Sequence, residues 1–221
     1  ADIITTNPPF GSKGKVEDPN ILSGYDFGFA WKKDKKSGKF EKGKLLAGKK
    51  GGGQVPDILF IERCLSLLKK GGRMGIVLPD GDLTNQNTEF VRYWLKQRAQ
   101  IVAVVSVPST AFDPYGAKGI KTSILFIKKP KGKLPERYPI FFGNLIKIGY
   151  DIRGKKTYKR NDKGEVIDWE GRPIDYLTDR KGNKTKQDPV LIEIKGALDT
   201  DVPDMLKEWF KFKKEFKNYL W

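Results

Sequence analysis

The residues with the clearest chemical meaning lie near the start of the chain, where Asn7, Pro8, Pro9 and Phe10 follow the β-branched run 2–6. Each proline fixes its own φ angle and has no N–H donor, so the turn is stiff and its carbonyl groups keep one direction. Asn7 offers a side-chain oxygen as a hydrogen-bond acceptor, and Pro8 offers its main-chain oxygen. Phe10 supplies a ring face for stacking. Two fixed acceptors beside an aromatic face suit a planar ligand that carries an amino group.

An amino group on an aromatic ring is a poor nucleophile, because its lone pair is delocalised into the ring. Two acceptors that each take one amino hydrogen localise the lone pair and direct it at an electrophile such as a methyl donor. This is catalysis by positioning and electrostatics, and it needs neither a metal nor a protein nucleophile. A proline turn that only closes a strand is the alternative interpretation of residues 7–10.

The apolar pattern of the first 130 residues predicts the elements that position this turn. We expect helices at 56–70 and 88–98, and strands at 2–6, 73–78, 101–107 and 122–127. Alternating buried strands and amphipathic helices indicate an α/β sheet with right-handed crossovers. Ligand sites in such sheets lie beyond the carboxyl ends of strands, which is where residues 7–10 fall.

Other segments have a different composition. Residues 32–53 hold nine lysines and six glycines against two acidic residues, which predicts a mobile basic loop. Turn-forming residues recur over 150–188 and predict polar β-hairpins. An amphipathic helix is expected over 203–219. We therefore expect two parts, a sheet-forming part over 1–135 and a β-rich extension with a C-terminal helix over 136–221.

The chain is strongly basic, with 43 lysine and arginine residues against 27 acidic residues and a formal net charge of +16. This excess favours a polyanionic partner, because neutralised phosphates release their counterions. A lysine-coated surface typical of a heat-adapted protein is the alternative. No apolar run approaches the roughly 18 residues of a membrane span, so we expect no membrane association.

The types of residue that are missing or rare exclude several classes of enzyme. The sequence has no histidine, which excludes Ser-His and Cys-His nucleophile pairs and histidine metal sites within this chain. The single cysteine, Cys64, falls among apolar residues of an expected helix and suits a reducing, cytoplasmic compartment. Asp80 and Asp82 could together bind a metal ion, but two acidic residues in a glycine loop are weak evidence. We therefore expect no metal site.

Residues 7–10 resemble the catalytic motif of adenine-specific DNA methyltransferases, and most closely that of the methylation subunit of type I restriction-modification systems. The resemblance extends in the same order over about residues 1–170. Further segments that carry it are 71–81, 101–108, 119–126 and 149–151. It implies that 1–135 is the C-terminal half of a Rossmann-like, S-adenosylmethionine-dependent methyltransferase sheet.

The resemblance also implies roles for individual residues. Asn7, Pro8, Pro9 and Phe10 would be catalytic, and Asn7 would also border the cofactor. Asp80 and Gly81 would border the substrate pocket, and Lys121 and Thr122 would approach the target base, although ordinary turn and strand-edge chemistry is an equal alternative for these four. In the basic loop, Lys49 and Lys50 would contact DNA phosphates, with a merely solvated loop as the alternative. The implied partners are S-adenosylmethionine, double-stranded DNA, a sequence-specificity subunit and a restriction subunit.

One departure from the family is serious. The glycine-rich cofactor turn that precedes the catalytic motif in the family is absent from this sequence, and the chain begins without methionine. We therefore expect a fragment of a DNA adenine methyltransferase that is inactive alone. Two other functions stay open. One is methyl transfer to a protein glutamine amide or an rRNA amino group, and the other is a non-catalytic, basic nucleic-acid-binding module.

Overall fold

The computed structural model describes residues 1–11, 14–48 and 52–220. Its central sheet has five strands in the order β1-β4-β6-β5-β7. Their bounds are β1 Ile3–Thr6, β4 Arg73–Pro79, β5 Gln100–Val107, β6 Thr122–Lys128 and β7 Phe141–Asn144. The four strands expected over the first 130 residues are confirmed to within two residues at each end, and β7 is an addition at the sheet edge.

Four of these strands run in the same direction, because β1 pairs parallel with β4 and β5 pairs parallel with β7, while β6 runs antiparallel between β4 and β5. The link from β5 to β6, residues 108–121, contains only the short 3-10 helix η4, Asp113–Tyr115. This link holds no α-helix of the kind that a parallel crossover usually contains, and it returns the chain antiparallel. The mixed α/β sheet confirms the expected fold class.

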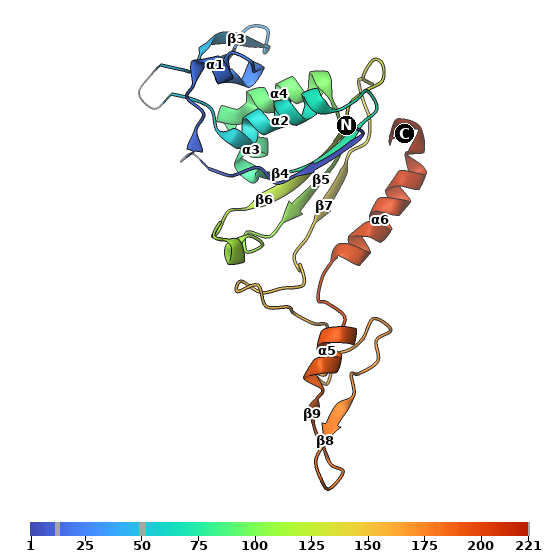
Figure 1. The fold of residues 1–221 in the computed structure, drawn as a ribbon. Helices are drawn as coiled ribbons and strands as arrows, with labels where there is room; N and C mark the ends of the chain where they lie inside the picture. The colour runs from blue at the N-terminus through green and yellow to red at the C-terminus, as the bar shows by residue number, and fades with distance from the viewer. Residues whose placement is uncertain (12–13, 49–51, 221) are drawn as a thin grey trace. The chain divides into compact units, whose positions relative to one another are not determined.

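Two amphipathic helices, α2 Pro56–Leu67 and α4 Glu89–Arg98, cover one face of the sheet (Figure 1). The core between helices and sheet is fully buried at Leu22, Phe27, Ile61, Met74, Ile76, Leu78, Val91, Leu95, Leu125 and Ile127. Cys64 is a buried free thiol in α2, as expected. The C-terminal end of α2 is held by Lys129, whose ammonium donates to the carbonyls of Leu65 and Leu68 at 2.8 Å each.

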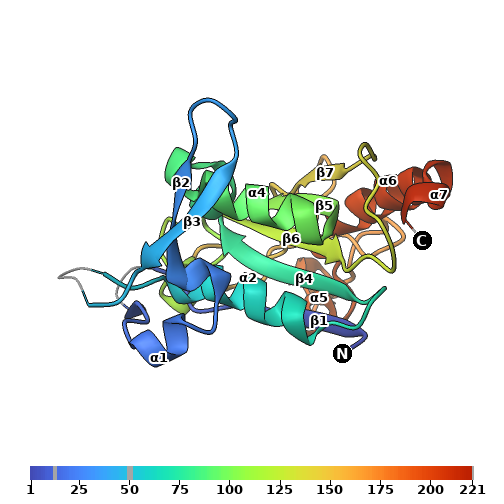
Figure 2. The same ribbon diagram turned by 90° about the horizontal axis from the view of Figure 1, so that it is seen from above.

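The segment 32–53, which was expected to be a mobile basic loop, contains strand residues at 32–33 and 40–45. The chain forms α1 Pro19–Leu22, the 3-10 helix η2 Asp26–Gly28, and an antiparallel hairpin of β2 Phe29–Lys33 with β3 Phe40–Leu45 (Figure 2). Aromatic contacts to α4 stabilise the hairpin, because Trp31 stacks on Phe90 and Phe40 packs on Tyr93. Lys49 and Lys50 lie outside the described residues.

The chain divides into two compact units, and the division differs from the expected boundary at 135/136. Unit 1 comprises 1–107, 121–144 and 209–221, and unit 2 comprises 108–120 and 145–208. Strand β7 belongs to unit 1 because it extends the central sheet. The end of the helix α6 Val202–Glu215 also belongs to it, because Trp209 and Phe212 pack edge-on against Phe141 of β7. Helix α7, Lys217–Leu220, follows.

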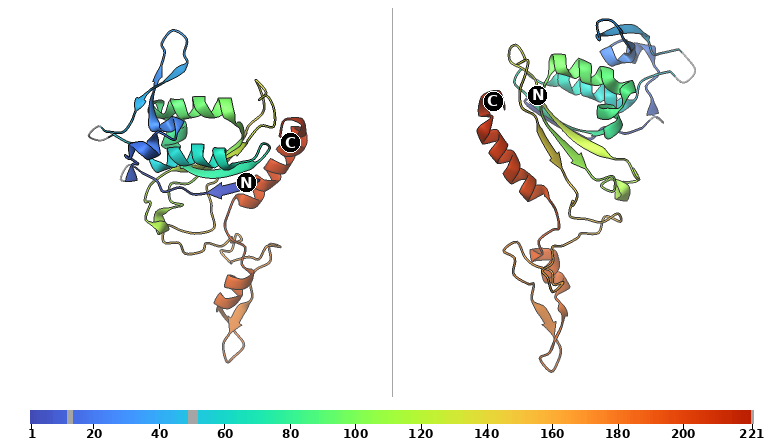
Figure 3. Two further views of the ribbon diagram at one scale, coloured as in Figure 1. Left: turned by 45° about the horizontal axis from the view of Figure 1, so that its top comes forward. Right: turned by 180° about the vertical axis from the view of Figure 1, so that it is seen from behind.

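Unit 2 confirms the expected hairpin-rich character of 150–188. It contains the hairpin of β8 Tyr176–Thr178 and β9 Lys184–Gln187, followed by α5 Pro189–Lys195 (Figure 3). Its turns repeat one device. The side chains of Asp151, Asn161, Asp168 and Asp179 each accept backbone N–H groups two and four residues later. A glycine with positive φ completes each turn three residues on. No helix among the described residues is both long and apolar enough to span a bilayer.

Candidate active site

The Asn7–Phe10 turn leaves the sheet at the carboxyl end of β1. Thr6, the last residue of β1, pairs with Ile76, and β4 continues to Pro79 beside the turn. Pro8 is buried, Phe10 is half-buried, and Asn7 and Pro9 are exposed. Among the described residues, the Asn7 amide has no hydrogen-bond partner. A buried proline thus anchors the turn while the amide remains available at the sheet edge, as the proposed chemistry requires.

The carboxyl end of β4 and the start of β6 meet at the same edge of the sheet, where Pro79 pairs with Thr122. The carboxyl group of Asp80 accepts the hydroxyl of Ser123 at 2.6 Å and lies 3.7 Å from the ammonium of Lys121. The N–H of Asp80 donates to the Lys121 carbonyl at 3.0 Å. The structure therefore brings Asp80, Gly81, Lys121 and Thr122 together, although they lie some 40 residues apart in sequence.

Thr122 is the least accessible of these four residues. Its side chain is fully buried, and its hydroxyl has no hydrogen-bond partner among the described residues. The approach of Thr122 to a target base therefore stays a prediction, which would require the buried side chain to become accessible. Ser123, which the sequence did not single out, makes the hydrogen bond to Asp80 instead.

Two acidic side chains of unit 1 are buried: Asp57, which the sequence did not single out, and Asp82, which the sequence suggested only as half of a weak metal-binding pair. Asp57 lies in the first turn of α2 and is 2% exposed, and Asp82 lies in the short helix α3, Asp80–Thr84, and is 8% exposed. Burial raises the pKa of Asp57, whose carboxyl group accepts the N–H group of Ile58 at 2.9 Å. Burial, and then the charge of Asp57, raise the pKa of Asp82 to about 7.

The two carboxyl groups that the sequence suggested as a pair, Asp80 and Asp82, have different neighbours in the structure. Asp82 is electrostatically coupled to Asp57 from another element, whereas Asp80 is engaged with Lys121 and Ser123. Among the residues the structure describes, no group of three or more acidic or cysteine side chains could hold a metal ion. The sequence gave little reason to single out Asp57. It directly follows Pro56 and looks like an ordinary acidic residue of a first helical turn.

The lysine-rich β2–β3 hairpin is fixed at its base by a network around Asp26. Its carboxyl group accepts the Trp94 indole N–H at 2.8 Å and the Lys42 ammonium at 2.9 Å, and it also pairs with Arg98. Burial raises the pKa of Asp26, but these hydrogen bonds and charges together hold it below its ordinary value. Glu62 of α2 accepts the N–H groups of Asp26 and Phe27. The hairpin is therefore held to both helices.

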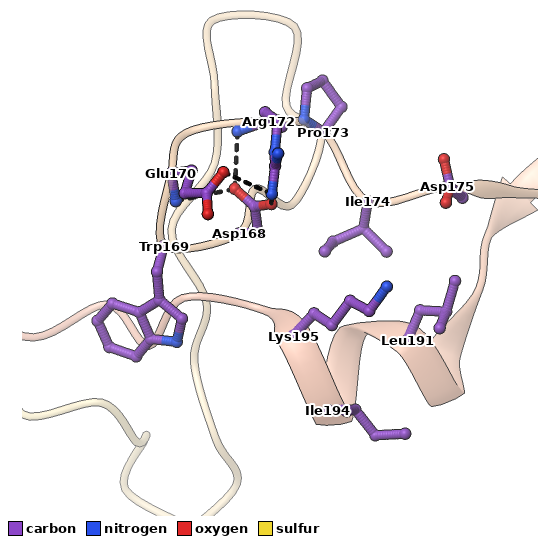
Figure 4. A pocket seen from close by; sticks show the side chains of 10 residues that line it. All are labelled: Asp168, Trp169, Glu170, Arg172, Pro173, Ile174, Asp175, Leu191, Ile194 and Lys195. Carbon is purple, nitrogen blue, oxygen red and sulfur yellow. Dashed lines mark hydrogen bonds and ion pairs between the residues drawn. The ribbon is translucent and has the colours of Figure 1, made fainter.

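A separate pocket lies within unit 2. It has a volume of about 530 Å³ (Figure 4) and is lined by Asp168, Trp169, Glu170, Arg172, Pro173, Ile174, Asp175, Leu191, Ile194 and Lys195. The guanidinium of Arg172 pairs with both Asp168 and Glu170 at its rim. None of its residues was predicted to be functional, and none belongs to the Asn7–Phe10 turn.

Comparison with known proteins gives consistent results. The family model described as N-6 DNA Methylase matches residues 1–175. The type I restriction enzyme EcoEI methylase subunit of Escherichia coli is 28% identical over 184 residues, which cover 82% of this chain and 31% of that protein. The chain thus spans less than two thirds of this relative.

Two solved structures are similar in part. A putative class I S-adenosylmethionine-dependent methyltransferase from Listeria monocytogenes is 18% identical with a TM-score of 0.47, over 65% of this chain and 36% of that one. The type I restriction enzyme EcoKI M protein is 23% identical with a TM-score of 0.38, over 58% and 21%. The family match itself covers most of the sequence, and on that match the chain belongs to the N-6 DNA methylase family.

Proposed function

We propose that this chain forms the target-base side of a type I DNA adenine methyltransferase, which transfers a methyl group from S-adenosylmethionine to the N6 amino group of a flipped adenine. The observation that carries the proposal is the exposed Asn7 amide at the carboxyl end of β1, anchored by the buried Pro8. The Asp80–Lys121 pair occupies the same edge of the sheet. The longer parent would act with a specificity subunit on double-stranded DNA, and a restriction subunit is a further candidate partner.

The chain's own residues would act on the adenine. The Asn7 side-chain oxygen accepts one amino hydrogen and the Pro8 carbonyl accepts the other, so the nitrogen lone pair is localised. Phe10 stacks on the extruded base, which lowers the cost of holding it outside the duplex. S-adenosylmethionine, when bound, supplies the electrophilic methyl group. The residues present fit the base side of such a site, whereas on the cofactor side they supply only Asn7.

The distribution of charge supports a nucleic acid over a protein substrate. Unit 2 holds 15 lysine and arginine residues against 14 acidic residues, whereas the rest of the chain holds 28 against 13. The excess therefore lies in the unit that contains the Asn7–Phe10 turn. A positive electrostatic field around the site attracts the phosphates of a nucleic acid. The same field gives no such attraction for the neutral side chain of a protein glutamine.

The Asn7 proposal is tested in the full-length protein with S-adenosylmethionine and unmethylated DNA. Replacing Asn7 with alanine removes one of two fixed acceptors, and we expect kcat to fall by about 10²–10³-fold. Asn218→Ala is the control, because Asn218 is an exposed asparagine of α7. Unchanged methylation by Asn7→Ala would refute the catalytic assignment and favour a non-catalytic DNA-binding module. Methylation of a protein or of rRNA, but not of DNA, would favour the other alternative.

A further inference from the structure

Lys121 directly precedes β6, at the edge of the sheet that also carries the Asn7–Phe10 turn. Strand β4 lies between β1 and β6. Neighbouring strands are about 4.8 Å apart, so the backbones of β1 and β6 are separated by roughly 10 Å across the sheet. Lys121 therefore borders the site and does not lie directly beside the two acceptors, Asn7 and Pro8.

The ammonium of Lys121 lies near Asp80 but keeps its hydrogen-bond donors. It is 3.7 Å from the Asp80 carboxyl group, which is beyond the roughly 3.2 Å limit of a good N–H to O hydrogen bond. Among the residues that the structure describes, this ammonium donates no hydrogen bond. Lys147 of unit 2 differs, because its ammonium donates to Asp199 at 3.1 Å. The three donors of Lys121 are thus available to a ligand.

Two hydrogen bonds explain why Asp80 does not close on this ammonium. One carboxyl oxygen of Asp80 accepts the hydroxyl of Ser123 at 2.6 Å, and Ser123 is itself 6% exposed within the sheet. The N–H of Asp80 donates to the carbonyl of Lys121 at 3.0 Å, so the two backbones are fixed to each other. Only the second carboxyl oxygen faces Lys121, and it stays at the longer distance.

The exposure and charge of Lys121 suit a phosphate ligand. Its side chain is 59% exposed, so the ammonium lies at an open edge rather than in the wall of a closed base pocket. A lysine ammonium is a compact point charge that commonly binds phosphate oxygens. Lys121 also adjoins the unit that carries nearly all of the positive excess, which attracts the backbone of a nucleic acid.

We propose that Lys121 binds a backbone phosphate of the target strand beside the flipped adenine, through the donors that Asp80 leaves free. The inference rests on the proposed function, since a phosphate reaches Lys121 only if this edge of the sheet faces DNA. It assigns Lys121 to the DNA backbone, whereas the sequence resemblance implied that Lys121 approaches the base.

The first experiment separates a phosphate contact from a simple ion pair. Lys121→Gln alone leaves the charge of Asp80 uncompensated, so Lys121→Gln is combined with Asp80→Asn. In the full-length protein assembled with its specificity subunit, we expect this double variant to bind DNA about 5–10-fold more weakly. The slope of log K against log salt should fall by about 0.9. Lys147→Gln with Asp199→Asn, an ion pair of similar exposure in unit 2, is the control and should change neither quantity.

A second experiment locates the phosphate. A neutral methylphosphonate replaces, one at a time, the phosphates that flank the target adenine, and the unchanged protein and Lys121→Gln are compared on each DNA. At the contacted position the neutral linkage should weaken binding of the unchanged protein about 5–10-fold. It should weaken binding of Lys121→Gln by less than about 2-fold, because that variant has already lost the contact.

Two results would overturn the inference. Recovery of normal DNA binding by the double variant would show that Lys121 only neutralises Asp80. Equal losses in Lys121→Gln and in the unchanged protein at every neutral linkage would show that Lys121 contacts none of these phosphates. In both cases the proposed function stands if Asn7→Ala abolishes methylation. If Asn7→Ala methylates DNA normally while Lys121 behaves as expected, the proposed function fails and the phosphate contact remains.

Discussion

At the residue scale, Asp82 shows how burial changes the contribution of an acidic side chain. The residue is 8% exposed, its Oδ2 has no hydrogen-bond partner among the described residues, and its pKa is raised from 3.8 to about 7. Because the folded state binds this proton more tightly than the unfolded state does, the group stabilises the fold below pH 3.8. That contribution is lost as the pH rises towards 7.

Asp82→Asn should therefore change the pH dependence of stability. The amide imitates the protonated carboxyl group, so the variant and the unchanged chain should have similar free energies of unfolding at pH 5. At pH 8 the unchanged chain carries the cost of a buried charge, and the variant should be more stable by about 2–3 kcal/mol. Denaturant unfolding at the two pH values measures this difference. A difference that does not change between pH 5 and pH 8, as we expect for the exposed control Asp204→Asn, would show that Asp82 is not buried as described.

The same residues show why sequence could predict one part of the site and not the other. Asn7, Pro8, Pro9 and Phe10 are contiguous, so their chemistry is visible in the sequence without knowledge of the fold. The pair of buried acidic residues Asp57 and Asp82 exists only after the chain has folded. In sequence, Asp82 stands nearest to Asp80, and only the folded structure shows that the charge of Asp57 acts on it.

At the element scale, the strands and helices of the central sheet could be predicted because each has an apolar period of its own. The β2–β3 hairpin could not, because its apolar residues, Phe29, Trp31, Phe40 and Leu45, are outnumbered by lysines. The contacts that stabilise it, Trp31 with Phe90 and Phe40 with Tyr93, join segments some 50–60 residues apart. Packing against α4 therefore overrides a composition typical of a loop.

We propose the ordered hairpin as a place for the DNA backbone contacts that were predicted at Lys49 and Lys50. Lys32, Lys35, Lys36 and Lys39 are exposed around its tip, whereas Lys33 and Lys42 pair with Glu89 and Asp26. Replacing the four exposed lysines with glutamine should weaken binding of the full-length protein to DNA. The slope of log K against log salt should fall by up to about 0.9 for each phosphate that the variant no longer neutralises, since fewer counterions are then released.

A matched set in unit 2 provides the control for this experiment. Lys155, Lys163, Lys181 and Lys186 are also exposed, but they belong to a unit with almost no net charge. The same four lysine-to-glutamine changes there should leave the salt slope of DNA binding unchanged. Equal effects of the two sets would indicate a general charge effect rather than a contact made by the hairpin.

At the scale of the whole molecule, the two units differ in structure and in charge. Unit 1 contains the sheet, the Asn7–Phe10 turn and nearly all of the positive excess, whereas unit 2 is built from short hairpins and repeated turns around a pocket. The division could not be predicted from composition, because β7 and the end of α6 return to the sheet after the change in composition at residue 136. Aromatic packing of Trp209 and Phe212 on Phe141 accounts for that return.

The composition of unit 1 also predicts how the chain will behave towards S-adenosylmethionine. The described edge of the sheet supplies acceptors for a base, but the sequence has no glycine-rich turn between a strand and a helix that could approach a nucleoside closely. We therefore expect the 221-residue chain to bind S-adenosylmethionine with a Kd weaker than about 1 mM, above −4.1 kcal/mol. Isothermal calorimetry with the full-length protein as the positive control measures it. A micromolar Kd for the 221-residue chain would mean that residues of unit 1 form a cofactor site by themselves. It would contradict the proposal that this chain supplies only Asn7 on the cofactor side.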